Sequence, residues 1–394
     1  MPLSQLWDLI RDTVRQADHL LLSLCVAVNL FGIALIYSAT RYDPALHSYP
    51  LKQFIAMGIG IVLFFLLSQL DLETVLSRWQ WVLAGSLLFI ALLAIPGVGH
   101  SVGGNRSWIA FPLFSLQPAE MVKLTFTMLL AKQIITLNQN PGISHPLSVA
   151  ALCAHLGLFT GVIFAASRDA GTALVYLAIF AVMLWAGGLH PAWFALGLVI
   201  LTLAGTTLWL RLPEENYWKM RILVCFDHDL DPAFRGFQQT RSLLAIQSGK
   251  LYGMGYLQGN LTQAGYRSAL PARHTDFIFS VCCEELGLLW SAVLLLLLTG
   301  IILRCIYISV HAGSPFYALM GVGYAAMFLV QITLNIGMCL FLLPVIGLTL
   351  PFVSYGGSSL ITAYAAMGLL SGIRQRGIPE WLRESREDVW DGAT

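Results

Sequence analysis

Residues 270–303 read LPARHTDFIFSVCCEELGLLWSAVLLLLLTGIIL, and this stretch decides the fold. Its second half, residues 286–303, is an apolar run without a charge, long enough to cross a bilayer as a helix. Arg273, His274 and Asp276 stand close together just before that run. A guanidinium, an imidazole and a carboxylate at the start of a membrane helix indicate chemistry at the membrane surface. A charged helix flank that snorkels past the lipid would also explain them.

The rest of the chain has the same apolar character. Of its 394 residues, 57% are hydrophobic and 11% are charged, whereas about 25% of the residues in a soluble domain are charged. The net charge of +1 gives no reason to expect a nucleic-acid partner. The seven cysteines show neither the spacing of zinc ligands nor a disulfide framework. The composition therefore predicts a polytopic membrane protein.

Apolar runs predict where the chain crosses the membrane. They lie at 19–40, 53–70, 81–96, 118–135, 147–166, 171–186, 191–210, 286–303, 316–343 and 360–373. These runs predict about ten transmembrane helices and an all-α fold, which we interpret as a single membrane domain over 1–394. Residues 211–283 form one long loop with no obvious domain of its own, and such loops are usually functional. The polar segment 1–18 is expected at the membrane surface, and no cleavable signal peptide is expected.

The basic residues predict the orientation. An even number of spans places both termini on one side. If that side is the inside, nine basic residues lie on inner segments and four on short outer loops: Arg11, Arg15, Arg78, Lys132, Arg304, Arg374, Arg376, Arg383 and Arg386, against Arg41, Lys52, Arg106 and Arg168. This excess favours cytoplasmic amino and carboxyl termini, with loop 211–283 outside.

Several polar groups stand where lipid makes them costly. Glu120 and Lys123 lie three residues apart inside one predicted span, so on a helix they share a face and can pair. Charges inside a span usually mark a functional site, but a purely structural pair between spans is an equal alternative. Asp169 directly precedes an apolar run and is expected to cap that helix.

Two loops add candidates. The sequence GGNRSW at 103–108 places Arg106 beside a tryptophan, which suits anionic headgroups or a pyrophosphate, or else an interfacial anchor. The sequence LPFVSYGGSS at 350–359 carries Ser354, Ser358 and adjacent glycines, which indicates irregular backbone lining a cavity, or a tight turn. The long loop itself contributes Arg221 and Gln238 as further candidates.

Taken together, these motifs resemble one family over nearly the whole chain. They are QPAE with Lys123 at 117–123, DAGTAL at 169–174, LPARHTDFIF with EELG at 270–287, and PFVSYGGSS at 351–359. Asn335 and the following Ile-Gly-Met, with Leu343-Pro344, add a fifth. The chain is identified by these motifs as similar to the SEDS family (shape, elongation, division and sporulation). Arg273 directly before His274 looks closer to its RodA branch than to its FtsW branch.

The resemblance implies a peptidoglycan glycosyltransferase of the bacterial cytoplasmic membrane. Such proteins polymerise lipid II, release undecaprenyl pyrophosphate, and work with a class B penicillin-binding protein that crosslinks the new strand. Asp276 is then the expected general base. Arg273, Arg221 and Arg106, in that order, are expected to stabilise the pyrophosphate, with His274, Ser354 and Ser358 as further substrate contacts. A Mg²⁺ or Mn²⁺ ion near Asp276 is compatible with this chemistry, although no metal ligands are identified.

Two other functions stay open from the sequence. A flippase or transporter for a lipid-linked sugar would also use intramembrane charges and broken helices. A non-catalytic scaffold for a penicillin-binding protein would not need Asp276. The chain also departs from the family pattern at Arg168, Arg241, Gln247 and Lys250, where relatives have a proline, a glutamine and two glycines. The departures at Arg241, Gln247 and Lys250 are expected to stiffen the long loop.

Overall fold

Each predicted span lies on a helix of the structure, a computed structural model that describes residues 11–95, 97–102, 105–111, 115–228, 230–231, 236–264 and 270–373. These helices are α2 (His19–Thr40), α3 (Tyr49–Ser68), α5 (Trp79–Ala91), α6 (Pro118–Gln139), α7 (Pro146–Ser167), α8 (Ala170–Ala186), α9 (Pro191–Arg211), α12 (Ile278–Val310), α13 (Pro315–Cys339) and α14 (Gly357–Ile373). The all-α, polytopic class is confirmed. Residues 1–10 of the predicted surface segment and the basic tail from 374 onward lie outside the described residues.

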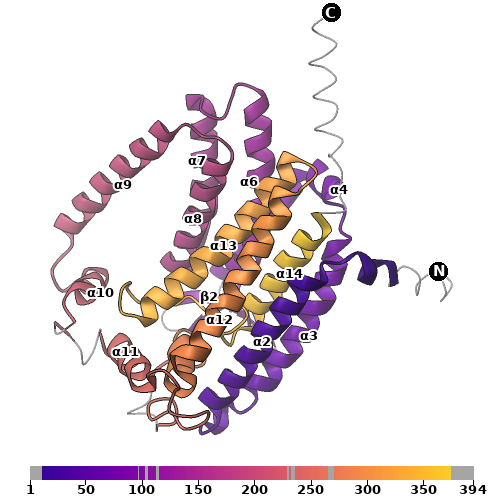
Figure 1. Cartoon of the computed structure of the whole chain (residues 1–394). Helices are drawn as coiled ribbons and strands as arrows, with labels where there is room; N and C mark the ends of the chain where they lie inside the picture. Colours follow the sequence, from indigo (N-terminus) through magenta and orange to yellow (C-terminus); the bar gives the residue numbers. More distant parts are fainter. Residues whose placement is uncertain are drawn as a thin grey trace, which may run out of the picture.

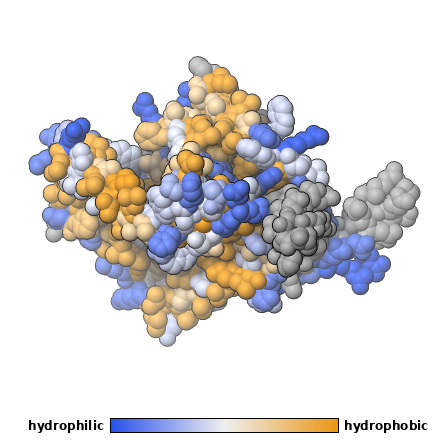
Figure 2. All heavy atoms as spheres, turned by 90° about the horizontal axis from the view of Figure 1, so that it is seen from above, coloured by the Kyte–Doolittle hydropathy of each residue, from blue (hydrophilic) through white to orange (hydrophobic). Residues whose placement is uncertain are grey.

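Length and hydropathy agree with membrane insertion. Within the described residues, six helices are long and apolar enough to span a bilayer alone, namely α2, α3, α7, α9, α12 and α13. Helices α5, α8 and α14 are apolar but shorter, and α6 carries Glu120, Lys123 and Lys132. Figure 2 shows broad orange areas of apolar side chains on the face seen from above, beside blue hydrophilic ones. Such exposed apolar area fits a surface that faces lipid.

Local sequence signals explain where the helices begin. Helices α6, α7, α9 and α13 each start on a proline, whose fixed φ suits the first helical position and whose missing N–H costs nothing there. Asp18 caps α2 by accepting a bond from the Leu21 backbone N–H at 2.9 Å. The spans are therefore set by their termini as well as by hydropathy.

The helices form a bundle around α13 (Figure 1). Helix α13 packs against α12, α8 and α6, α14 packs against α3, and α12 packs against α2. Helix α9 is different, since none of its residues is buried. Figure 1 shows it standing apart from α13 and α14. The side chains of Leu198 and Leu210 on it are 67% and 77% exposed, so within the described part of the chain α9 contributes little to the core.

A small sheet precedes α6, which the sequence did not lead us to expect. Its antiparallel strands are β1 (Gly99–Val102), β2 (Asn105–Ala110) and β3 (Ser115–Leu116), with Gly99 opposite Ile109 and Ile109 opposite Leu116. Short helical turns complete this half of the molecule: η1 (Pro44–Leu46), α4 (Leu72–Ser77) and η2 (Leu92–Ala94). The strands are only two to six residues long, too short to give a clear alternating pattern.

The long loop also contains helices that its weak apolar periodicity did not predict. They are α10 (Tyr217–Phe226) and α11 (Phe237–Gly249). Helix α11 packs against α12, where Ser242 Oγ lies 2.6 Å from Ser280 Oγ, and Gln239 and Ala245 are also buried. The sequence therefore contained no indication of these two helices. Helix α11 carries many polar side chains, so a hydropathy pattern does not reveal it.

Both ends of the described chain lie at one end of the bundle. The backbone N–H of Asp18 donates to Ser371 Oγ at 2.8 Å, and the Asp18 carboxylate pairs with Arg304 of α12 at 2.7 Å. Helices α12 and α14 run from the opposite end, which carries α11 and the loop 340–356. We call that opposite end the loop end.

Candidate active site

Asp276 lies at the loop end, in a tight turn that leads into α12. The backbone N–H groups of Thr275 and Phe277 both donate to Ala272 O, at 3.1 and 3.2 Å. Ala272 adopts a left-handed conformation, with φ of 46°. Phe277 is fully buried and anchors the turn on the bundle. The turn therefore presents its polar side chains from a fixed backbone.

Three successive carbonyl oxygens of this turn each accept a hydrogen bond, two from the loop between α13 and α14 and one from α13. His274 O accepts from the Tyr355 N–H at 2.9 Å, Thr275 O from Ser354 Oγ at 2.6 Å, and Asp276 O from Asn335 Nδ2 at 2.8 Å. Two of the donors sit in the loop that the sequence singled out at 350–359, and the third is in α13. The polar loop and the Asp276 turn, far apart in sequence, thus form one assembly.

The Asp276 side chain is partly exposed and in a mixed electrostatic environment. Burial raises the pKa of the Asp276 carboxyl from 3.8 to about 6, against the opposing effects of a hydrogen bond from the Thr275 side chain and the charge of Arg221. A methyl group on Gly347 would lie 3.9 Å from Asp276 Oδ2, so this glycine, at φ of 70°, borders the carboxyl without covering it. A carboxyl with a pKa near neutrality can exchange a proton at physiological pH.

Arg221 is the cation that the structure places near Asp276. It lies on α10, where its Nη1 donates to Val345 O at 2.7 Å and its guanidinium lies over the Tyr217 ring, 4.4 Å from the centroid. These contacts hold α10 against the loop that follows α13. They also keep a fixed positive charge at the loop end, as the sequence led us to expect for a residue that stabilises an anion.

Arg273 is used differently from the prediction. Its Nη1 donates to Thr262 O and to Ala264 O, the second at 3.2 Å, so the guanidinium holds the loop that precedes it. Burial lowers the pKa of Arg273, with Asp43, Glu284 and Glu285 acting in the opposite direction. A guanidinium bonded to two carbonyl oxygens serves the protein first, and a substrate contact by Arg273 stays a prediction.

His274 lies in an aromatic group and is uncharged at neutral pH. Its ring meets the Tyr49 ring edge-on at 5.3 Å, and Tyr49 stacks on Tyr355 at 3.9 Å. Burial, and then the charge of Arg273, lower the pKa of His274 to about 4, with Asp43 acting in the opposite direction. His274 therefore adds no cation to the site.

The two serines proposed as substrate contacts have internal partners. Ser354 is buried, donates to Thr275 O and accepts from the Leu350 N–H at 2.8 Å. Ser358 is also buried and accepts from the Gln117 N–H at 3.0 Å. Ser354 thus fixes the loop between α13 and α14, and Ser358 ties the start of α14 to the start of α6. A substrate contact by either serine stays a prediction.

Arg106 is placed in the small sheet. Its Nη2 donates to Ile95 O at 2.7 Å and its Nε to Gly99 O at 3.2 Å, so it ties β2 to the end of η2. Gln238 lies on α11 beside Gln239, whose Nε2 donates to Leu343 O at 2.7 Å. A functional role of Gln238 stays a prediction.

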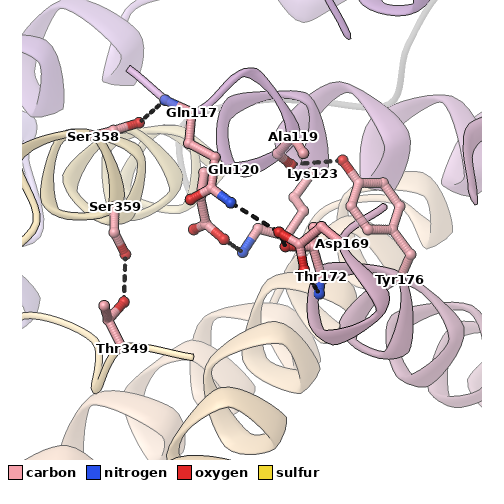
Figure 3. Close-up of polar contacts among 10 residues, drawn as sticks. All are labelled: Gln117, Ala119, Glu120, Lys123, Asp169, Thr172, Tyr176, Thr349, Ser358 and Ser359. Carbon is pink, nitrogen blue, oxygen red and sulfur yellow. Dashed lines mark hydrogen bonds and ion pairs between the residues drawn. The ribbon is translucent and has the colours of Figure 1, made fainter. Parts of the chain in front are cut away.

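The predicted intramembrane pair is present. Lys123 Nζ lies 2.7 Å from Glu120 Oε1, and the two residues are 0% and 6% exposed. Figure 3 shows the two side chains pointing toward each other on α6. Tyr176 of α8 donates to Ala119 O beside them at 2.8 Å. The pair therefore lies in the bundle interior, where pairing compensates the cost of burying each charge.

Asp169 joins this cluster and caps α8, as expected. Its Oδ1 accepts from the Thr172 N–H at 3.0 Å and its Oδ2 from Thr172 Oγ1 at 2.8 Å. Gln117 Nε2 reaches the same Oδ2 at 3.1 Å (Figure 3). Because the Gln117 N–H also bonds Ser358, this residue links α6, α8 and α14. The motifs at 117–123, 169–174 and 351–359 therefore meet in one place.

Two carboxylates of the EELG motif were given no role of their own from the sequence. Glu284 and Glu285 are both 0% exposed at the start of α12. Glu284 accepts bonds from Leu261 and Thr262, and Glu285 accepts from Ser38 and Gln263. Their signal was present, since two adjacent carboxylates opening an apolar run are costly unless the protein supplies partners.

The described residues contain no group of three or more His, Cys, Asp or Glu side chains arranged to hold a metal ion. A divalent cation at Asp276 would thus have fewer than three such side chains from the described part of the chain. Hard cations such as Mg²⁺ accept such sites when phosphate oxygens of a substrate supply the remaining ligands. The donor set fits a metal only in that shared form.

Together these features define a class: a polytopic membrane protein whose loop end holds a carboxyl of near-neutral pKa beside a fixed cation. Comparison with known proteins gives the family. Residues 17–377 match the model of the cell cycle protein family FTSW_RODA_SPOVE, and the chain belongs to this family.

Individual relatives match this chain over nearly their full length. The chain is 32% identical to the "Probable peptidoglycan glycosyltransferase FtsW" of Geobacter metallireducens, over 93% of this chain and 97% of that protein. A solved structure described as "Structural coordination of polymerization and crosslinking by a peptidoglycan synthase complex" contains a chain with TM-score 0.78 and 29% identity, covering 91% and 98% of the two chains. The rod shape determining protein RodA of Thermus thermophilus matches with TM-score 0.66 and 27% identity over 91% and 97%.

Proposed function

We propose that this chain polymerises lipid II into glycan strands with Asp276 as the general base. By its family and relatives it is a peptidoglycan glycosyltransferase. The assignment to Asp276 rests on its carboxyl, which has a pKa of about 6 and lies at the loop end. The turn that carries it is fixed by hydrogen bonds to three successive backbone carbonyl oxygens. Such a group is ionised at neutral pH and still basic enough to take a proton.

In the reaction, an acceptor sugar hydroxyl attacks the anomeric carbon of the donor. Asp276 takes the hydroxyl proton as the new C–O bond forms. The bond between the anomeric carbon and the pyrophosphate oxygen breaks, and undecaprenyl pyrophosphate leaves with the electron pair. Arg221, the fixed cation near Asp276, stabilises the charge that develops on this leaving group.

The site's position suits a lipid-anchored substrate. Asp276 lies one residue before the N-cap of α12, so the lipid can stay in the bilayer while the sugars reach the turn. We place the protein in the bacterial cytoplasmic membrane with the loop end outside and both termini cytoplasmic, on the basis of the basic residues. Single cysteines at the exposed positions 258 and 260 should then react with an impermeant reagent in intact cells, whereas one in the tail 374–394 should not. The reverse pattern would refute the orientation.

The partner in this proposal is a class B penicillin-binding protein. The support is the similarity to a chain whose structure is described as a peptidoglycan synthase complex coordinating polymerisation and crosslinking. The polymerase makes the strand and the partner crosslinks it. If a divalent cation, Mg²⁺ or Mn²⁺, binds here, Asp276 would be the residue that holds it, and the ion would help neutralise the charge of the pyrophosphate, with the substrate supplying most of the ligands.

The test uses the purified protein in liposomes with lipid II, with and without the partner, and scores glycan strands on a gel. We expect polymer with the wild-type chain, and less after chelation of divalent cations, restored by Mg²⁺ or Mn²⁺. No polymer in any arm, with intact protein, would refute the proposal. Movement of lipid II across the vesicle membrane without polymer would instead indicate a flippase, and stimulation of the partner alone would indicate a scaffold.

A further inference from the structure

We propose that Glu284 is a positioning residue for Asp276, acting through Thr262 and Arg273. This inference rests on the proposed function. The three residues form what we call the loop clamp: Glu284, Thr262 and Arg273. The clamp joins α12, at Glu284, to the segment 261–264 and then to the turn that carries Asp276. None of its members needs to contact substrate for it to act.

The carboxylate of Glu284 is fully buried, and its hydrogen bonds are made by one short segment. Oε1 accepts from the Leu261 N–H at 2.7 Å, and Oε2 accepts from the Thr262 N–H at 2.8 Å and from Thr262 Oγ1 at 2.6 Å. Bonds to an ionised acceptor are stronger than neutral ones, and three of them from two adjacent residues fix the backbone there. The segment is thus bound to α12.

The same segment holds Arg273 from its other side. Arg273 Nη1 donates to Thr262 O and to Ala264 O. Thr262 therefore bonds Glu284 through its N–H and hydroxyl, and Arg273 through its carbonyl. Because Arg273 is three residues before Asp276, the position of segment 261–264 is passed on to the turn. These contacts lead from Glu284 of α12 through Thr262 and Arg273 to the turn directly before α12.

The backbone of α12 is built to accept this loop. The helix is broken at Gly287, with φ of 76°, and the freed carbonyls of Glu284 and Glu285 accept from the N–H groups of Met254 and Gly255, each at 2.9 Å. A methyl group on Gly249 would lie 1.8 Å from Cys283 O. The approach is so close that only glycine fits, which indicates a contact that the fold requires.

Glu285 supplies a comparison within the same turn. It accepts from Ser38 Oγ of α2 at 2.6 Å, from Gln263 Nε2 at 2.6 Å and from the Leu257 N–H at 3.1 Å. It therefore anchors the loop to α2 and, among the residues that the structure describes, is not bonded to Thr262 or Ala264, which hold Arg273. Removing the carboxylate of Glu285 should loosen the loop, whereas weakening the clamp should move Asp276 itself.

The decisive variants change individual hydrogen-bonding groups of the clamp. Thr262→Val removes the hydroxyl bond to Glu284 at nearly constant shape, and Thr262→Ser keeps it. Arg273→Lys removes the guanidinium that spans two carbonyl oxygens. Glu215→Gln, at an exposed position, is the matched control for a Glu284→Gln change.

For wild-type chain and variants in liposomes, kcat and KM for lipid II are measured, together with hydrogen exchange of residues 270–277. We expect Thr262→Val, Glu284→Gln and Arg273→Lys to lower kcat by about ten- to a hundredfold with KM changed less than about threefold, because a small misplacement of a catalytic group has this effect. Thr262→Ser and Glu215→Gln should retain wild-type kcat, and exchange at 270–277 should rise only in the first three variants.

Wild-type kcat in Thr262→Val and Glu284→Gln, or a loss that Thr262→Ser does not restore, would overturn the inference. If the wild-type chain made no polymer, the proposed function would fail and hydrogen exchange would decide the clamp. Faster exchange at 270–277 in Thr262→Val, absent in Glu215→Gln, would then support it, and unchanged exchange would refute it.

Discussion

Glu120 and Asp276 are carboxylates in opposite electrostatic situations. Glu120 lies in the bundle interior with Lys123 at 2.7 Å. Asp276 lies at the loop end, partly exposed, and no ion pair to it occurs among the residues that the structure describes. For Glu120, pairing compensates burial. For Asp276, the burial effect exceeds the effect of Arg221, so the pKa of its carboxyl rises.

The difference separates two uses of a charge in a membrane protein. The buried pair joins two residues of α6 in the bundle interior and contributes to stability. A half-buried carboxyl with a pKa near neutrality changes its protonation during a reaction. We therefore expect substitutions at Glu120 to act on stability and substitutions at Asp276 to act on rate.

The largest expected effect is on rate. Asp276→Asn keeps the shape of the side chain but cannot accept the proton, so lipid II polymerisation should fall by about 10²–10⁴-fold. Because the pKa of Asp276 is raised in the folded protein, ionisation of this group lowers stability as pH rises through about 6, and the asparagine variant avoids this loss. Its melting temperature at pH 7 should thus equal or exceed that of the wild type. Near wild-type polymerisation would remove Asp276 from the mechanism.

The next effect is on stability. Glu120→Ala or Lys123→Ala leaves one charge buried without its partner, which typically costs about 3–5 kcal/mol in the free energy of unfolding. A Glu120→Leu/Lys123→Leu double variant removes both charges and should recover much of that loss. Thermal unfolding in detergent, followed for all four proteins, measures the coupling. Additive losses in the double variant would show that the two residues do not act as a pair.

A third effect is on pH dependence. The rate should fall about tenfold for each pH unit below about 6 and level off above it, since the base must be ionised. Arg221 lowers the pKa of Asp276, so Arg221→Gln should move the midpoint to higher pH. His274→Gln should leave it in place, since the pKa of His274 is lowered to about 4. If the midpoint moved in His274→Gln instead, the titration would belong to His274, and its assignment to Asp276 would be wrong.

The smallest effect tests whether the loop end carries strain that catalysis needs. Lys250 follows α11 with φ of 50°, a conformation that favours glycine, which relatives have at this position. Lys250→Gly should stabilise the protein by about 1 kcal/mol with the polymerisation rate unchanged. The matched change Gln247→Gly lies inside α11 and should cost about 0.5–1 kcal/mol. A faster or slower enzyme with Lys250→Gly would mean that this backbone strain contributes to function.

Hydropathy was sufficient for the spans. The predicted runs at 19–40 and 191–210 match α2 and α9 to within one residue, because lipid requires long apolar helices and proline or aspartate marks their starts. The same signal did not distinguish α9, which buries no residue, from α13, which is the centre of the bundle. Both are apolar around their circumference, so burial depends on neighbours that hydropathy does not encode.

Residue chemistry was sufficient for pairs close in sequence. Glu120 with Lys123 and the cap at Asp169 depend on spacings of three residues and were predicted correctly. The internal hydrogen bonds of Arg273 and Ser354 were not foreseen, because their partners are backbone carbonyl oxygens of Thr262 and Thr275, and a carbonyl is identical in every residue. A sequence shows which side chains can donate a hydrogen bond, but the fold decides which backbone carbonyl accepts it.

The break of α12 at Gly287 also bears on the order in which the molecule assembles. The apolar run after Gly287 can enter the membrane alone, while the preceding turns carry Glu284 and Glu285, whose partners lie in the loop 257–263 and in α2. Until that loop has folded back, both carboxylates need water and stay at the surface. We therefore expect membrane insertion to precede formation of the site, so that a newly made chain can be fully inserted and still inactive.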